Sequence, residues 1–463
     1  MSAILLAGAT VITVASHRPR DERVDILVVD GTIAEIGRDI TAPATTEVVD
    51  LTGRIIAPGL VNAHLHTWQA ALRFAGADWT LPEYLARMHG EVAHRYTPDD
   101  MRIGTASGAT AQIDAGVTTI GDWCHNCLTH DHAVAAIEGL VESGIRAVFL
   151  HGTPHGVRDR PHDIAMFDRL MSGPIAAGPL LTGGLAIKGP QLSSATTAVA
   201  DMTAARDRGV VVTMHQSNGI PGDAWDVVDR HRLWGPRVNI VHGTQIPTPL
   251  VRRLLDRGVT FTSTPENELG QGHRSDIVAE VVAAGGSPSL GTDGDMFVSG
   301  DVRIAARMAL SRQRATEHED ARRDTGMIAH STPTGTADAL RWATIEGARA
   351  LGLADTVGTV EVGKRADLVV IDATGVSMWP HHDPVAAALH AHSGAVEAVL
   401  VEGRWRKRDH ALVGVDVADL QAQAWRSGSR LIDLVRADGL HRRVRRRVVQ
   451  KVVNRRFSGP RET

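Results

Sequence analysis

Cysteine is scarce in this sequence of 463 residues, and positive charge is not in excess. The two cysteines, Cys124 and Cys127, cannot form the disulfide framework of a small secreted domain, and they are too few for a structural four-cysteine zinc site. The net charge of -4 excludes a basic field over the whole chain, so we expect no nucleic-acid partner. Together these observations predict a cytoplasmic protein.

Long apolar runs are also missing. None reaches the length that spans a membrane, so we expect no membrane association. The first 25 residues lack the positive segment of a secretory signal, and their alternating β-type residues predict a strand. A glycine-rich phosphate loop after the first strand of the central region is absent as well, which argues against a doubly wound nucleotide-binding sheet.

The central part of the chain alternates short apolar runs with amphipathic helical patterns. One run leads into His64, and seven more follow at about 115–123, 143–152, 180–189, 208–216, 237–243, 257–266 and 285–294. Repeated strand–helix units predict a parallel sheet, and eight of them close naturally into a barrel. We therefore predict an α/β fold with a (β/α)8 TIM barrel over residues 58–355.

The two ends of the chain have a different pattern. Residues 1–57 and 356–412 contain short strands with hairpin turns, including two apolar runs joined by Asp30-Gly31. We predict that they share one small β-sandwich domain into which the barrel is inserted. Residues 413–463 predict a helical extension whose last part, 441–457, is strongly basic. A solvated helix face or an oligomer contact is the expected role there, with binding to an anionic surface as the less favoured alternative.

Residues of the metal-ligand type close several of the predicted strands. They are His64, His66, His215, His242 and Asp293. Any one of them alone would more often be a hydrogen-bonded terminal residue. The carboxyl ends of barrel strands meet on one rim, however, and five such residues there can supply the nitrogen and oxygen ligands of a catalytic divalent ion. The pattern therefore favours a metal site.

These motifs also carry a family resemblance. The segment 58–66, which ends in His64-Leu-His66, the strand-ending His215 and His242, Asp293 in Gly-Thr-Asp-Gly, and the tail motif at 358–372 together resemble the amidohydrolase superfamily. The resemblance covers about residues 1–410 and is closest to the branch of cytosine and guanine deaminases and triazine hydrolases (chlorohydrolases).

The resemblance implies roles for the strand-end residues. His64, His66, His215 and Asp293 would hold one divalent ion per chain, with zinc expected and iron or manganese as alternatives. Asp293 would take a proton from the activated water and pass it to the leaving group, and His242 would hydrogen-bond the water or the developing oxyanion.

The implied activity is metal-dependent hydrolysis of a carbon–nitrogen bond, with deamination of an aminated N-heterocycle as the leading prediction. Dechlorination or cyclic-amide hydrolysis of a related ring and a non-hydrolytic lyase reaction are the enzymatic alternatives. A barrel that retains only a binding role is the alternative from another class. A homodimer is expected from the habit of the family.

Two positions bear on the predicted mechanism. Deaminases of this branch usually carry a glutamate three residues after the fifth-strand histidine, whereas this chain has Asn218, which cannot act as an acid. Our hypothesis is that Glu266 takes the acid role, although the slightly favoured interpretation of Glu266 and Glu268 is that they are solvated loop or cap residues. Lys188 follows the fourth strand, where dinuclear relatives have a metal-bridging lysine, but the other motifs favour a mononuclear site.

Contacts with the substrate are predicted from the loops that follow the strands. The expected contact residues are Trp68, Gln69, His155, Gln191 and Asn218. The tryptophan could stack on a planar ring, or it could pack beneath a lid.

Overall fold

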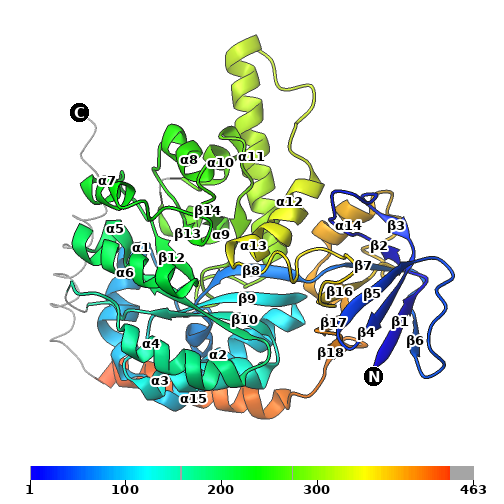
Figure 1. Ribbon diagram of the computed structural model, residues 1–463, viewed down its shortest axis with the longest axis horizontal. Helices are drawn as coiled ribbons and strands as arrows, with labels where there is room; N and C mark the ends of the chain where they lie inside the picture. Colours follow the sequence, from blue (N-terminus) through cyan, green and yellow to red (C-terminus); the bar gives the residue numbers. More distant parts are fainter. Residues whose placement is uncertain (1, 157–158, 274, 438–463) are drawn as a thin grey trace.

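Eight parallel strands form the central sheet of the protein, as the computed structural model shows for residues 2–156, 159–273 and 275–437 (Figure 1). In chain order they are β8 (Leu60–Leu65), β9 (Val117–Cys124), β10 (Arg146–Gly152), β11 (Leu181–Ile187), β12 (Val211–His215), β13 (Val238–Val241), β14 (Thr260–Ser263) and β15 (Ser289–Leu290). Each strand pairs in parallel with the next, and a parallel bridge between Leu65 and Asp293 joins the last to the first. The predicted (β/α)8 barrel is therefore confirmed.

Helices follow the strands and cover the outside of the barrel. The helices include α2 (Pro98–Asp114), α3 (His130–Ser143), α4 (Ile164–Leu170), α6 (Ala195–Arg208), α7 (Asp223–Arg230), α8 (Thr248–Leu255), α10 (Val278–Ala283), α11 (Val302–Thr325), α12 (Thr336–Trp342) and α14 (Pro384–His390). Their ends follow local chemistry. Thr97 caps α2 by accepting the Asp100 amide, while Gly144 and Gly209 end α3 and α6 with φ of 71° and 62°.

Further helical elements lie between these helices. They are η1 (Thr67–Leu72), α1 (Leu81–Tyr84), η2 (Leu85–Val92), η3 (Ala93–Arg95), η4 (Met171–Ile175), α5 (Gly189–Leu192), α9 (Pro265–Gln271), α13 (Ile345–Ala350) and η5 (Ser393–Ala395). Two of them matter for the site, because η2 and α9 follow strand ends and return toward the barrel mouth.

The two chain ends contribute two further sheets beside the barrel (Figure 1). One has the order β5 (Thr32–Gly37), β4 (Asp25–Val29), β1 (Ala3–Ala7) and β6 (Glu47–Asp50). The other has the order β19 (Ala411–Leu412), β18 (Arg404–Arg408), β17 (Val396–Val401), β16 (Leu368–Asp372), β7 (Arg54–Pro58), β2 (Thr10–Val11) and β3 (Glu22–Arg23). Leu6 and Ile26 of the first pack with Ile56, Leu368 and Leu400 of the second in one buried cluster.

A tight turn sets the register of the first of these sheets. Asp30 and Gly31 join β4 to β5 and have φ of 46° and 79°, so both central residues of the turn lie in the left-handed region. This matches the hairpin predicted from Asp-Gly. The exact domain boundaries stay a prediction.

The chain then continues into α15 (Val417–Ala437), which packs against α2. Ser427 donates a 2.7 Å hydrogen bond from Oγ to Asp100 Oδ1, and Arg430 pairs with the same carboxylate. The predicted basic segment at 441–457 lies outside the described residues. Within those that are described, no helix is long and apolar enough to cross a membrane.

A buried ion pair connects the barrel to the adjoining sheet. Arg146, at the start of β10, donates from Nε and Nη2 to the two carboxylate oxygens of Asp367 at 2.9 and 3.0 Å. The side chains are 9% and 1% exposed, and Asp367 also accepts the Glu402 amide. Removal of one partner from such a pair leaves the other charge buried and uncompensated.

We therefore expect Asp367→Ala to destabilise the protein by about 3–5 kcal/mol. The matched control is Asp168→Ala, which removes an equally bidentate partner of Arg208 from an exposed surface and should cost about 1 kcal/mol or less. Chemical denaturation midpoints of the two variants measure the difference. Equal midpoints would show that the Arg146–Asp367 pair does not hold the two parts together.

Candidate metal centre

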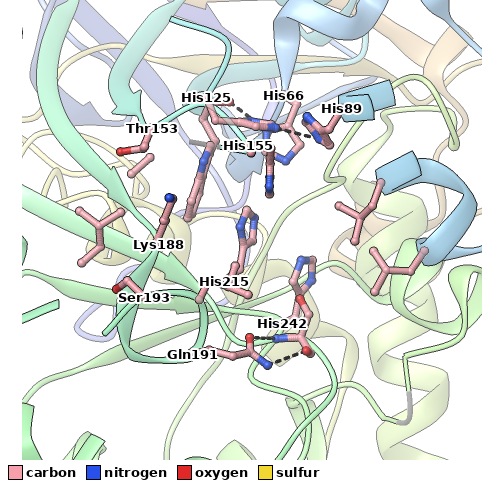
Figure 2. Close-up of a pocket in the computed structure, with 18 of the residues that line it drawn as sticks. His66, His89, His125, Thr153, His155, Lys188, Gln191, Ser193, His215 and His242 are labelled. Carbon is pink, nitrogen blue, oxygen red and sulfur yellow. Dashed lines mark hydrogen bonds between the residues drawn. The ribbon is translucent and has the colours of Figure 1, made fainter. Parts of the chain in front are cut away.

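Four of the predicted strand-end residues, His66, His215, His242 and Asp293, line a cavity of about 630 Å³ at the carboxyl end of the barrel, and His64 is buried behind its surface. Histidine dominates its wall (Figure 2). The lining histidines are His66, His89, His125, His155, His215, His242 and His273, with Asp293 among them.

Four of the predicted residues converge on one point. One ligand-type atom from each of His64, His215, His242 and Asp293 lies within 4.8 Å of all the others. His64 Nε2 is 3.0 Å from Asp293 Oδ1 and 3.2 Å from His215 Nε2. His66 lies outside this mutually close group, but its Nε2 is 3.3 Å from Asp293 Oδ1.

The backbone explains how these groups come together. His64 and His66 are two residues apart at the end of β8 and so share a face. Asp293 lies opposite them with φ of 64°, in the left-handed region, where its amide donates to His64 O at 3.1 Å and its carbonyl accepts the His66 amide at 2.7 Å. Gly291 permits this approach, since a Cβ there would lie 2.6 Å from His64 O.

Proton counting shows that these groups fit a divalent ion. His66 Nδ1 lies 2.9 Å from the Trp123 carbonyl, which can only accept, so a neutral His66 directs the electron pair of Nε2 toward Asp293. His64 Nδ1 is buried without a partner, so hydrogen bonds leave this ring incompletely satisfied. A cation at the point of convergence accepts these electron pairs, and the His66–Trp123 bond is the outer contact that orients a metal-binding imidazole.

Burial favours the protonation states that bind a metal. It lowers the pKa of His64 to about 3 and the pKa of His215 well below its ordinary value, so both rings are neutral at pH 7. Burial alone would raise the pKa of Asp293, but contacts with His64 and His66 hold that pKa well below its usual range. The carboxylate is therefore ionised, as a ligand or a general base must be.

His242 is held by a carboxylate that the sequence did not single out. Its Nδ1 lies 3.1 Å from Glu268 Oε1 and 3.1 Å from Thr264 Oγ1, and its own φ is 66°. Burial opposes protonation of His242, but the hydrogen bond to Glu268, with the charges of Asp293 and Glu268, raises the His242 pKa above its ordinary value. Because Nδ1 faces Glu268, Nε2 is the nitrogen left to act in the cavity.

Glu268 is itself fully enclosed. It has no exposed surface and accepts the Thr264 amide at 2.7 Å and Ser263 Oγ at 2.7 Å. Glu268 lies four residues after Thr264, the N-cap of α9, whereas Glu266 lies two residues after it. This spacing is the sequence signal that could have distinguished the two glutamates. Asn267, between the two glutamates, donates to Asp293 Oδ2.

Glu266, the predicted acid, is placed differently. It is partly buried and is not among the residues of the cavity wall. Its pKa is raised by burial and by Asp301 rather than by groups of the site. The structure thus gives Glu268, and not Glu266, a contact with the cluster.

The five predicted substrate contacts divide into two groups. His155 and Gln191 line the cavity. Gln191 Oε1 accepts the backbone N–H of Ser217 at 2.7 Å, and Gln191 Nε2 donates to the Ser217 carbonyl at 2.6 Å. Trp68 and Gln69 are fully buried behind the wall, where Gln69 Nε2 donates to Tyr84 OH at 2.8 Å.

Asn218 is only partly buried and, like Trp68 and Gln69, lies outside the cavity wall. Its Nδ2 donates to Gly272 O at 3.3 Å, and the residue does not line the cavity. Lys188, the position that raised the dinuclear alternative, does line the cavity.

Comparisons with known proteins agree with this geometry. A 5-methylthioadenosine/S-adenosylhomocysteine deaminase of Symbiobacterium thermophilum is 28% identical over 448 residues, which cover 93% of this chain and 100% of the relative. A zinc-bound adenosine deaminase structure from Xanthomonas campestris superposes with a TM-score of 0.78 at 22% identity, covering 93% and 99% of the two chains. The zinc complex of an atrazine chlorohydrolase from Arthrobacter aurescens gives 0.78 at 21% identity, covering 92% and 100%.

The two solved structures share the fold of this chain, and the deaminase relative agrees with the predicted metal-dependent deamination of an aminated heterocycle. The His and Asp cluster could hold one metal, in agreement with the predicted cofactor. The sequence pattern that defines the amidohydrolase family matches residues 55–406. The chain belongs to the amidohydrolase family.

Proposed function

We propose that the protein is a metal-dependent aminohydrolase that releases ammonia or an amine from an aminated N-heterocycle, with 6-aminopurine nucleosides as the first substrates to test. The observation that carries this proposal is the convergence of His64, His215, His242 and Asp293 on one point, with the last three lining the cavity. A volume of about 630 Å³ suits a ligand of nucleoside size. The choice of purine nucleosides rests on the names of the relatives.

The proposed roles are metal binding, proton transfer and stabilisation of the developing negative charge. His64, His66, His215 and Asp293 would hold the divalent ion, which when bound supplies the charge that makes a water molecule acidic near neutral pH. Asp293, kept ionised by its neighbours, accepts the proton of that water and delivers it to the leaving nitrogen. His242 donates a hydrogen bond to the oxygen on which negative charge develops.

The proton that other deaminases take from a glutamate needs another source. Asn218 cannot provide it, and its amide is directed at Gly272 O. His242 can, because Glu268 stabilises its protonated form from the side opposite the cavity. We propose that the Glu268–His242 pair replaces the missing acid, with Glu268 as a positioning residue that does not touch the substrate.

An ammonia-release assay across purine nucleosides, pterins, aminopyrimidines and aminotriazines tests the function. Asp293→Asn should lower turnover by about 10²–10⁴-fold, because it removes a general base. Dialysis against a chelator should abolish activity and added zinc should restore it. The matched control is Asp168→Asn, which changes an exposed carboxylate far from the cavity.

Two outcomes would contradict the proposal. Wild-type turnover in Asp293→Asn would show that Asp293 is not the general base. Activity that survives complete metal removal would show that the reaction does not need the metal. Chloride release from a halogenated triazine, without ammonia from any amine, would favour the dechlorination alternative.

The paired variants Glu268→Gln and Glu266→Gln test the acid. Glu268→Gln should lower kcat by about 100-fold, while Glu266→Gln should stay within about twofold of the wild type. The pH profile adds a readout that lost packing alone would not change. Protonated His242 is the active form, so activity falls as pH rises through its pKa; without the Glu268 charge that pKa drops, and the basic limb should move to lower pH.

Equal effects of the two variants would show that Glu268 has no special role. A hundredfold loss in Glu266→Gln alone would return the acid role to Glu266.

A further inference from the structure

A second cluster of histidines lies in the cavity wall beside the candidate metal centre. One ring nitrogen from each of His89, His125 and His155 lies within 4.8 Å of the other two. His125 Nε2 and His89 Nε2 are 3.2 Å apart, and the His155 ring centroid is 4.0 Å from that of His89 and 5.0 Å from that of His125. Figure 2 shows the three side chains close together at one side of the cavity.

The three residues come from separate segments. His125 follows β9 directly, and His155 lies in the loop after β10. His89 lies within η2, a stretch of π-helix. Single π-turns are rare and occur frequently at functional sites, because the extra residue changes the direction of a side chain.

Hydrogen bonds within the protein do not satisfy the buried ring of His125. Its Nε2 lies 3.2 Å from His89 Nε2, so another histidine ring is its only neighbour among the hydrogen-bonding groups of the described residues. His125 Nδ1 has no partner at all, although the residue is only 3% exposed. A buried ring whose hydrogen bonds are incomplete within the protein is consistent with a bound ligand beside it.

The donor set and its spacing identify the kind of ligand. Neutral imidazoles suit zinc, copper, nickel and cobalt ions. Ligand nitrogens at about 2.0–2.1 Å from a tetrahedral ion lie about 3.3 Å from each other, close to the separation of the His89 and His125 nitrogens. All three residues line the cavity, so a fourth position would open onto it.

We propose that His89, His125 and His155 form a second binding site for a divalent transition-metal ion. None of the three is shared with the first site, although the rings of His125 and His66 are 4.4 Å apart between centroids. The site would place a second positive charge where a basic or anionic group of the substrate can reach it. It does not depend on the proposed reaction, since metal binding is measured without turnover.

Metal content and cobalt titration test this proposal. Protein stripped with a chelator is titrated with zinc or cobalt, desalted and analysed for bound metal. The wild type should bind two ions per chain, and both His155→Ala and the double variant His64→Ala/Asp293→Ala should bind one. In the double variant, cobalt absorption should report the second site alone, and adding His155→Ala there should weaken cobalt binding by at least about tenfold.

The control is His130→Ala, which removes an exposed histidine on α3 and should leave two ions bound. His155 lies on an exposed loop, so its replacement spares the fold, and circular dichroism verifies this for each variant. A single ion in the wild type would overturn the proposal, as would unchanged cobalt affinity in the His155→Ala combination. An equal loss in His130→Ala would show adventitious surface binding only.

Discussion

The buried carboxylate of Asp293 is the constraint on which the site depends. An ionised group with 5% exposure is stable only if positive charge or strong donors surround it, and its neighbours are the Asn267 amide and the rings of His64 and His66. Burial keeps the His64 ring neutral, so the ring by itself brings no full positive charge. A divalent ion held by these residues would supply the missing charge and accept the electron pairs of the imidazoles. Two local features permit this arrangement: the left-handed backbone at Asp293, and the absence of a Cβ atom at Gly291.

The same constraint extends outward through α9. This short helix starts at the end of β14 and supplies both Asn267, which donates to Asp293, and Glu268, which binds His242. Two neighbouring residues of one turn therefore fix two different groups of the cluster. The arrangement makes His242 the most readily protonated ring of the first cluster, because burial lowers the pKa of His64 and His215 while Glu268 raises that of His242. In the proposed mechanism, His242 is therefore the acid of a site that has asparagine at position 218.

Much of this could be predicted from the sequence because parallel strands obey simple rules. The alternation of strands and helices gave the barrel, and a period of two placed His64 and His66 on one face. Since all barrel strands end on one rim, His215, His242 and Asp293 could be grouped without knowledge of the loops.

The loops follow no such rule. Which of Glu266 and Glu268 faces inward depends on where α9 begins, and one residue of shift turns a side chain by about 100°. The burial of Trp68 and Gln69 depends on how η1 packs beneath the wall. The π-helical turn that carries His89 has no signature that we could identify in the sequence.

The most direct test of this account is an anomalous difference map, collected at the zinc edge, from crystals of the zinc-loaded protein. The account predicts a peak within bonding distance, about 2.0–2.2 Å, of ligand atoms from His64, His66, His215 and Asp293. A map with no peak at these residues, from protein that contains zinc, would contradict it.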